Sequence, residues 1–166
     1  MLVIRNATID DLEGITKIYN DAIKNTVATF DTEIKTIKEQ TKWFSDHGKK
    51  NPILVAKEND SVIGWAALSK YSTRCAYSNT AEISLYVREE NQGRGIGKKL
   101  MKSLIKEGKK AGLHVIIARI TDGNKKSIHI HESVGFSHIG IMKEVGCKFG
   151  KRLDVYLMQK IYNDKY

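Results

Sequence analysis

The stretch that decides the fold is Gln92-Gly93-Arg94-Gly95-Ile96-Gly97, near the middle of a 166-residue chain. Residues 80–87 before it predict a central β-strand, and apolar residues recur after it at helical spacing to about Gly112. Glycines let the backbone adopt positive φ and approach a ligand closely. The first amides of the following helix lack internal partners, so the turn forms a cradle that favours a phosphate. Arg94, Lys98 and Lys99 would add positive charge to it.

The spacing of these glycines, taken alone, leaves more than one role open for the turn. A P-loop is excluded because the Gly-x-x-x-x-Gly-Lys-Ser/Thr pattern is absent. A dinucleotide site would need the Gly-x-Gly-x-x-Gly spacing, usually after the first strand and with an acidic residue about 20 positions later. The turn here has the spacing Gly93-x-Gly95-x-Gly97 and lies in the middle of the chain, so it does not match. A tight strand-to-helix turn that binds no ligand is the remaining alternative.

The segments around this turn predict an α/β fold. Residues 2–5, 53–56, 62–68, 113–120, 136–144 and 153–158 complete the expected strands. Helices are expected from about 8 to 23, with a Thr8–Asp11 capping box, and over 36–47 and 124–134. Short turns such as Asn59-Asp60 join antiparallel strands, whereas the strand–helix–strand unit from 80 to 120 requires a parallel pair. We therefore expect a mixed sheet of about seven strands flanked by helices, in a single domain spanning residues 1–166.

The composition is typical of a globular protein, with 41% hydrophobic and 28% charged residues. The formal charge of +9 fits nucleic acid, an acidic surface or a cofactor rich in phosphates. A nucleic-acid-binding motif is lacking, so we expect no nucleic acid partner. We expect a cytoplasmic protein with no membrane partner, because no signal peptide or apolar span is evident. Cys75 and Cys147 are expected to be reduced thiols, and no zinc-ligand spacing is present.

Several motifs resemble those of known acetyltransferases. Gln92-x-x-Gly95-x-Gly97 resembles the signature of GNAT-type N-acetyltransferases, with the strand 83–87 before it and Asn124-x-x-Ser127 and Gly135-Phe136 after it. A closer match covers nearly the whole chain and resembles the phosphinothricin and methionine sulfoximine acetyltransferase family. It rests on Ile18-Tyr19-Asn20, Thr29-Phe30-Asp31, Arg74-x-x-Tyr77, Thr80-x-Glu82, Gly112-Leu113-His114 and Lys148-Phe149-Gly150-x-x-Leu153-Asp154.

The resemblance implies a GNAT-type acyltransferase fold, acetyl-CoA as cosubstrate, no metal and a homodimer. It places the cofactor pyrophosphate on the amides of residues 93 to 98 and the pantetheine arm along the preceding strand, which is expected to contain a local bulge. The implied cofactor-binding residues are Leu85, Tyr86, Val87, Gln92, Gly93, Arg94, Gly95, Ile96, Gly97, Lys98, Asn124 and Ser127.

Acetyl transfer to an amine needs a group that removes a proton, because an amine with a pKa near 9 or 10 is mostly protonated at neutral pH. Glu82, on the central strand, is the candidate general base, and the resemblance implies the same role. The alternative is an ion pair that positions Arg74 or the substrate. His131 stands where many relatives carry a tyrosine acid for the thiolate, and it is either that acid or a packing residue.

Substrate-binding candidates are Phe30, Arg74 and Tyr77. Arg74 precedes the catalytic strand and suits a carboxylate or phosphinate, while Phe30 suits a pocket wall. Lys148 and Arg152 are further candidates. The predicted function is transfer of an acetyl group to the primary amine of a small amino acid-like substrate, of the phosphinothricin or methionine sulfoximine type. The alternative is a protein N-terminus or a polyamine.

Overall fold

The structure is a computed structural model that describes residues 1–163. Its strands are β1 (Val3–Asn6), β2 (Ile53–Glu58), β3 (Ser61–Lys70), β4 (Thr80–Val87), β5 (Val115–Thr121), β6 (Ser137–Lys148) and β7 (Lys151–Ile161). Its helices are α1 (Leu12–Asn25), α2 (Ile37–Ser45), α3 (Ile96–Lys110) and α4 (Lys125–Ser133). Short 3₁₀ turns at Ile9–Asp11, Cys75–Tyr77 and Glu89–Asn91 connect some of them.

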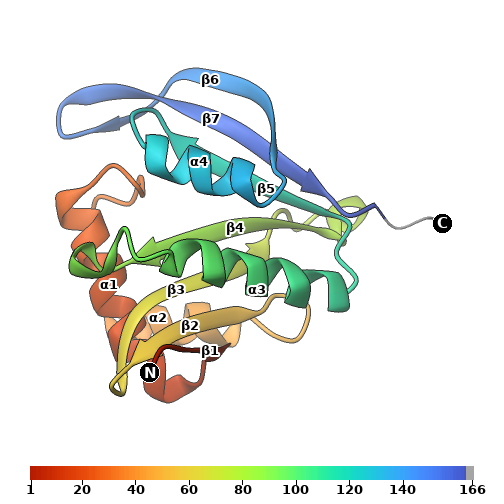
Figure 1. The fold of residues 1–166 in the computed structure, drawn as a ribbon. Helices are drawn as coiled ribbons and strands as arrows, with labels where there is room; N and C mark the ends of the chain where they lie inside the picture. The colour runs from red at the N-terminus through yellow and green to blue at the C-terminus, as the bar shows by residue number, and fades with distance from the viewer. Residues whose placement is uncertain (164–166) are drawn as a thin grey trace.

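The strands form one 7-stranded sheet in the order β1-β2-β3-β4-β5-β7-β6. Within residues 1–163, only β4 and β5 pair in parallel, and α3 makes the crossover between them. The other neighbours are antiparallel, as hairpins require. The predicted mixed sheet and the predicted order of elements are therefore confirmed (Figure 1).

The two faces of the sheet carry separate cores (Figure 1). On one face, α3 and α4 pack over a large cluster that includes Leu100, Leu104 and Met158. On the other, α1 and α2 cover Val55 and Trp65, and we call this side the α1/α2 face. Because side chains alternate along a strand, consecutive residues of β4 reach opposite cores.

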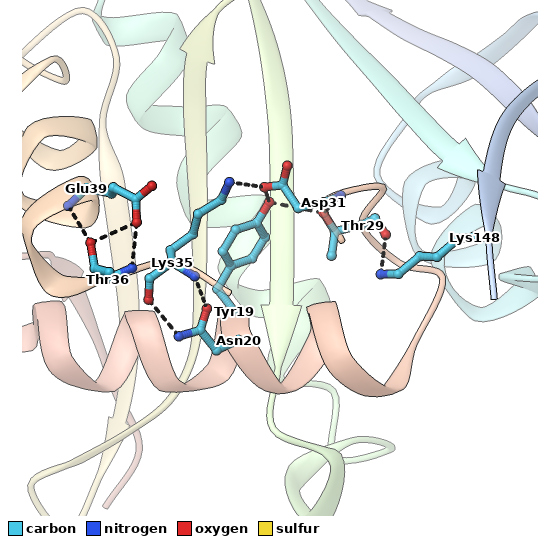
Figure 2. Close-up of polar contacts among 8 residues, drawn as sticks. All are labelled: Tyr19, Asn20, Thr29, Asp31, Lys35, Thr36, Glu39 and Lys148. Atoms are coloured by element: carbon cyan, nitrogen blue, oxygen red, sulfur yellow. Dashed lines mark hydrogen bonds and ion pairs between the residues drawn. The ribbon is translucent and has the colours of Figure 1, made fainter. Parts of the chain in front are cut away.

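The N-terminal capping box forms as expected, although it opens a 3₁₀ turn rather than the α-helix itself. The Thr8 amide donates to the buried Asp11 carboxylate at 2.9 Å, and α1 starts at Leu12. A second capping box joins Thr36 to Glu39 at the start of α2, where the Thr36 amide donates to Glu39 at 2.8 Å (Figure 2). Both boxes fix the ends of elements that cover the α1/α2 face.

The last hairpin is longer than the sequence indicated. The prediction ended one strand at 144 and began the next at 153, whereas β6 runs to Lys148 and β7 starts at Lys151. Phe149 and Gly150 both have positive φ, at 50° and 71°, which closes the hairpin in two residues. The tip of the hairpin therefore projects far enough to reach the loop between α1 and α2 (Figure 1).

Candidate functional site

The glycine turn forms an open cradle at the start of α3. Gly93 and Gly95 have φ values of 78° and 75°, and a side chain built at either position would meet no atom within 4 Å. The Gln92 amide donates to Glu89 and the Lys99 amide to Gly95. Within residues 1–163, the amides between them, 93 to 98, have no backbone acceptor outside the helix. These free amides at a helix N-terminus suit a phosphate group.

Two side chains of this turn have structural partners. Arg94 forms a bidentate ion pair with Glu58 at 2.8 and 3.0 Å, and this hydrogen bonding raises the pKa of the Arg94 guanidinium. The positive charge of Arg94, which was expected to help hold a phosphate, is therefore paired with Glu58 instead. Gln92 donates from its side chain to the Val87 carbonyl at 3.3 Å, which ties the turn to the end of β4. Lys98 and Lys99 are exposed in the first turn of α3.

Strands β4 and β5 stop pairing in the middle of the sheet, at a point that we call the fork. Their parallel ladder runs from Thr80 to Glu82 and goes no further. Residues 83–87 keep their pairing with β3 but have no strand partner on the β5 side within the described residues (Figure 1). The fork therefore leaves Leu85, Tyr86 and Val87 without a strand partner on this edge, where the Val87 carbonyl accepts from Gln92, and the predicted pantetheine position requires such an edge.

The bulge expected in β4 is absent from its ladder with β3. The register runs without a shift from Ala81 opposite Lys70 to Val87 opposite Gly64. The divergence from β5 opens the edge instead, so no extra residue in β4 is needed.

Asn124 and Ser127 lie at the start of α4. The Asn124 side chain accepts from the Ser127 amide at 3.2 Å and caps the helix. One turn later, Ile130 approaches the start of α3, since a Cβ on Gly97 would lie 3.5 Å from its Cδ1. The capped end of α4 thus lies on the same side of the sheet as the cradle.

His131 is buried at the end of α4. Its Nδ1 lies 2.7 Å from the Ser127 carbonyl oxygen, which can only accept, so Nδ1 carries the proton. Burial lowers the pKa of His131, which favours the neutral ring. Its Nε2 then has a lone pair and no proton, and the ring packs edge-on against Phe136 at 5.0 Å.

Glu82 lies at the fork and faces the α1/α2 side. Both of its carboxylate oxygens accept hydrogen bonds from Arg119, on β5, at 2.7 Å. The ion pair that the sequence left open as the alternative for Glu82 is therefore present, but its partner is Arg119 and not Arg74. Sequence reasoning missed Arg119. The usable signal was that Arg119 is a charged residue on β5, the strand parallel to β4, at one of the alternating positions that point to the same face as Glu82.

A cavity of about 260 Å³ opens on the same face beside Ser84. Aromatic rings of Tyr19, Trp43 and Trp65 form much of its wall, with Asp31, Lys35, Glu39 and Gln40 as the polar part. Tyr19 donates to Asp31 at 2.6 Å and contacts the Thr29 hydroxyl at 3.0 Å (Figure 2). Burial raises the pKa of Tyr19 and raises that of Tyr86 to about 12, so both phenols stay protonated.

The predicted substrate residues occupy two separate places. Phe30 packs on Gly146 of the last hairpin, and Lys148 beside it donates to the Thr29 carbonyl at 2.8 Å (Figure 2). Tyr77 packs edge-on against Tyr71 at 5.3 Å. The Arg74 guanidinium has no partner within residues 1–163, so the structure holds it against neither Glu82 nor Phe30.

A larger hollow, of about 470 Å³, lies elsewhere, between the segment 47–53 and the end of α3. It shares no lining residue with the cavity beside Ser84. The smaller cavity, and not this hollow, lies on the face of the sheet that carries Glu82 and the fork.

Within residues 1–163, no group of three or more metal-binding side chains is placed to hold a metal ion, and no helix is long and apolar enough to cross a membrane. Cys75 and Cys147 are both exposed and unpaired.

Comparisons with known proteins place the chain in a family. A family model for the acetyltransferase (GNAT) domain matches residues 4–157. An L-methionine sulfoximine/L-methionine sulfone acetyltransferase of Pseudomonas aeruginosa is 39% identical over 158 residues, covering 94% of this chain and 92% of that protein.

Two solved structures with acetyl-CoA agree with this match. The structure of yncA from Salmonella typhimurium, solved with its cofactor acetyl-CoA, has a TM-score of 0.96 and 34% identity, covering 100% of this chain and 96% of that one. A GNAT superfamily phosphinothricin acetyltransferase from Sinorhizobium meliloti has a TM-score of 0.92 and 35% identity, covering 96% of this chain and 88% of that one.

The chain belongs to the GNAT acetyltransferase family. It is an acetyl-CoA-dependent N-acyltransferase. The structure fits this cosubstrate, because the free amides of residues 93 to 98 suit its pyrophosphate and the unpaired edge of β4 suits its amide-bearing arm.

Proposed function

We propose that this enzyme acetylates the primary amine of a small amino acid-like substrate, of the methionine sulfoximine or phosphinothricin type. The observation that carries the proposal is the position of the Glu82 carboxylate, at the fork and on the same face as the aromatic cavity beside Ser84. The names of the P. aeruginosa and S. meliloti relatives support this substrate class.

Acetyl-CoA supplies the thioester that the amine attacks and the thiolate that leaves. Residues 93 to 98 bind its pyrophosphate through their amides, and Asn124 and Ser127 line the other side. A backbone amide of Leu85, Tyr86 or Val87 donates to the developing oxyanion from the free edge of β4.

Glu82 acts as the general base that takes the proton from the substrate ammonium. Its side chain is 23% exposed, so it is reachable from solvent and from the α1/α2 face. The Arg119 pair holds the carboxylate in one orientation, which favours a defined approach for the amine.

His131 acts in packing rather than as the acid, which is the alternative that the sequence left open. Donation from Nε2 would require an imidazolium, and the lowered pKa of His131 disfavours that form near neutral pH. The leaving thiolate then takes its proton from solvent.

Phe30 forms a wall of the amine site, and Arg74 and Tyr77 bind a distal acidic group of the substrate. A polyamine would instead favour a cavity of acidic groups only, but Lys35 lies beside Asp31 in the cavity wall, 3.3 Å from its carboxylate. Acetylation of a protein N-terminus or a polyamine is the alternative outcome of the assay below.

The assay follows CoA release from acetyl-CoA with a thiol reagent, over a panel of amines. We expect release with methionine sulfoximine or phosphinothricin and none with polyamines or peptides. The reverse pattern would contradict the substrate class.

Glu82→Gln should lower kcat by about 100-fold or more near pH 7. The deficit should shrink toward pH 9, where more of the amine is already neutral. Full activity of Glu82→Gln across pH 6 to 9 would show that Glu82 is not the base.

We further propose a cytoplasmic homodimer. The two exposed, unpaired thiols are typical of a reducing compartment. Ile139, Ile141 and Val145 of the edge strand β6 are all about half exposed, and a second copy would cover them. Light scattering of the purified protein tests the dimer, and a monomer at micromolar concentration would contradict it.

A further inference from the structure

Arg119 reaches across the fork to the candidate base. The β4–β5 ladder ends with Glu82 opposite Ile117, and Arg119 follows two residues later, so its side chain emerges on the same face. Its Nε donates to Oε1 of Glu82 and its Nη2 to Oε2, both at 2.7 Å. A cation and an anion are thereby held in direct contact where the fork meets the α1/α2 face.

This pair has unused binding capacity. A guanidinium has five N–H donors, and the pair with Glu82 engages only the Nε and Nη2 side. Within residues 1–163, Nη1 of Arg119 has no partner, and the side chain is 56% exposed. The hydrogen bonds to Glu82 raise the pKa of Arg119, so the guanidinium stays charged.

An α-amino acid presents the complementary pair of charges. Its ammonium and carboxylate are attached to the same carbon, so they contact neighbouring partners of opposite sign. A zwitterion entering here places its ammonium on Glu82 and its carboxylate on the unused Nη1 side of Arg119, so the Glu82–Arg119 pair stays in place and no charge is left unpaired. A bidentate guanidinium also suits the planar carboxylate.

We propose that Arg119 binds the α-carboxylate of the substrate and thereby selects α-amino acids over simple amines. This inference rests on the proposed function, because it takes Glu82 as the group that receives the amine. Arg74 is the rival arginine, but its guanidinium is not held beside Glu82, which leaves it for a more distant acidic group.

The test compares L-methionine sulfone with its primary carboxamide, which keeps the amine and side chain but lacks the carboxylate. Each variant is compared with the wild type on the same compound, so the different amine acidities of the two compounds cancel. Arg119→Gln should raise KM for the amino acid by at least about 10-fold. The same variant should leave KM for the carboxamide within about twofold. Arg74→Gln is the matched control and should not discriminate between these two compounds.

Calorimetry provides a second measurement without turnover. Arg119→Gln, titrated with methionine sulfone in the presence of CoA, should bind at least about 10-fold more weakly than the wild type. Thermal unfolding should be unchanged within a few degrees, because the side chain is more than half exposed.

Three results would overturn the assignment. An equal loss on both compounds would mean that Arg119 only orients Glu82. A selective loss in Arg74→Gln, with none in Arg119→Gln, would move the carboxylate site to Arg74. A wild-type enzyme that neither binds nor acetylates either compound would refute the proposed function, and this inference with it.

Discussion

A single added methyl group at Gly146 should disturb the amine site through Phe30. Gly146 lies on β6 opposite Leu153, and a Cβ there would lie 2.6 Å from both Cδ2 and Cζ of the Phe30 ring. Since Cβ contacts below 3.0 Å are essentially never found, the ring must leave its place. The φ of Gly146 is not positive, so alanine itself fits the backbone.

The size of the effect follows from the exposure of Phe30, which is 36%. The ring can turn toward solvent, so we expect Gly146→Ala to cost less than about 1 kcal/mol of unfolding free energy. If Phe30 is a wall of the amine site, the substrate loses contact worth about 1 to 2 kcal/mol. That loss corresponds to a fall of about 5- to 30-fold in kcat/KM.

The experiment measures kcat/KM and urea unfolding for Gly146→Ala, Phe30→Ala and the double variant. Gly140→Ala is the control on the same strand, because a Cβ there meets nothing within 4 Å. It should match the wild type within about 0.5 kcal/mol. Gly146→Ala should add nothing once Phe30 is alanine. An equal further loss in the double variant would refute the claim that the methyl group acts through the ring.

Two further predictions concern the cradle and the buried histidine. Gly95→Ala should destabilise the fold by about 1 to 2 kcal/mol and weaken acetyl-CoA binding, because φ is 75° there. Gly97→Ala, whose new Cβ would meet Leu85 at an ordinary 3.4 Å, should do neither, and urea unfolding with calorimetry compares them. Because the folded-state pKa of His131 is lowered by burial, stability should fall as pH drops below about 6.5, by at most about 1.4 kcal/mol per pH unit. His131→Gln should flatten this slope in urea melts from pH 7.5 to 5.5, and an unchanged slope would exclude His131 as its source.

The local structure around the glycine turn and the start of α4 follows from the sequence because local rules decide it. Positive φ at Gly93 and Gly95, a helix that starts directly after them and the Asn124 cap all act within a few residues. The mixed sheet also follows from connection lengths, since a crossover helix requires parallel strands and a two-residue turn such as Asn59-Asp60 requires antiparallel ones.

The substrate side depends on contacts between distant segments, which no local pattern encodes. Arg119 lies 37 residues from Glu82, and Lys148 lies 119 residues from Thr29. Arg74 is nearer in sequence to Glu82 and was the natural partner to expect, but strand register decides which side chains meet. The same is true of Phe30, whose contact with Gly146 depends on how far the last hairpin extends.

The fork has a mechanical consequence. At one end, β4 and β5 are joined by the ladder from Thr80 to Glu82. At the other end, the bond from Lys148 to Thr29 fastens the hairpin of β6 and β7 to the loop after α1 (Figure 2). The packing of Phe30 on Gly146 adds a second contact between the same two segments. Because the gap between β4 and β5 is held at both ends, the two strands cannot move further apart unless the Lys148 bond breaks. These contacts therefore resist a change in the separation of β4 and β5 beyond Glu82.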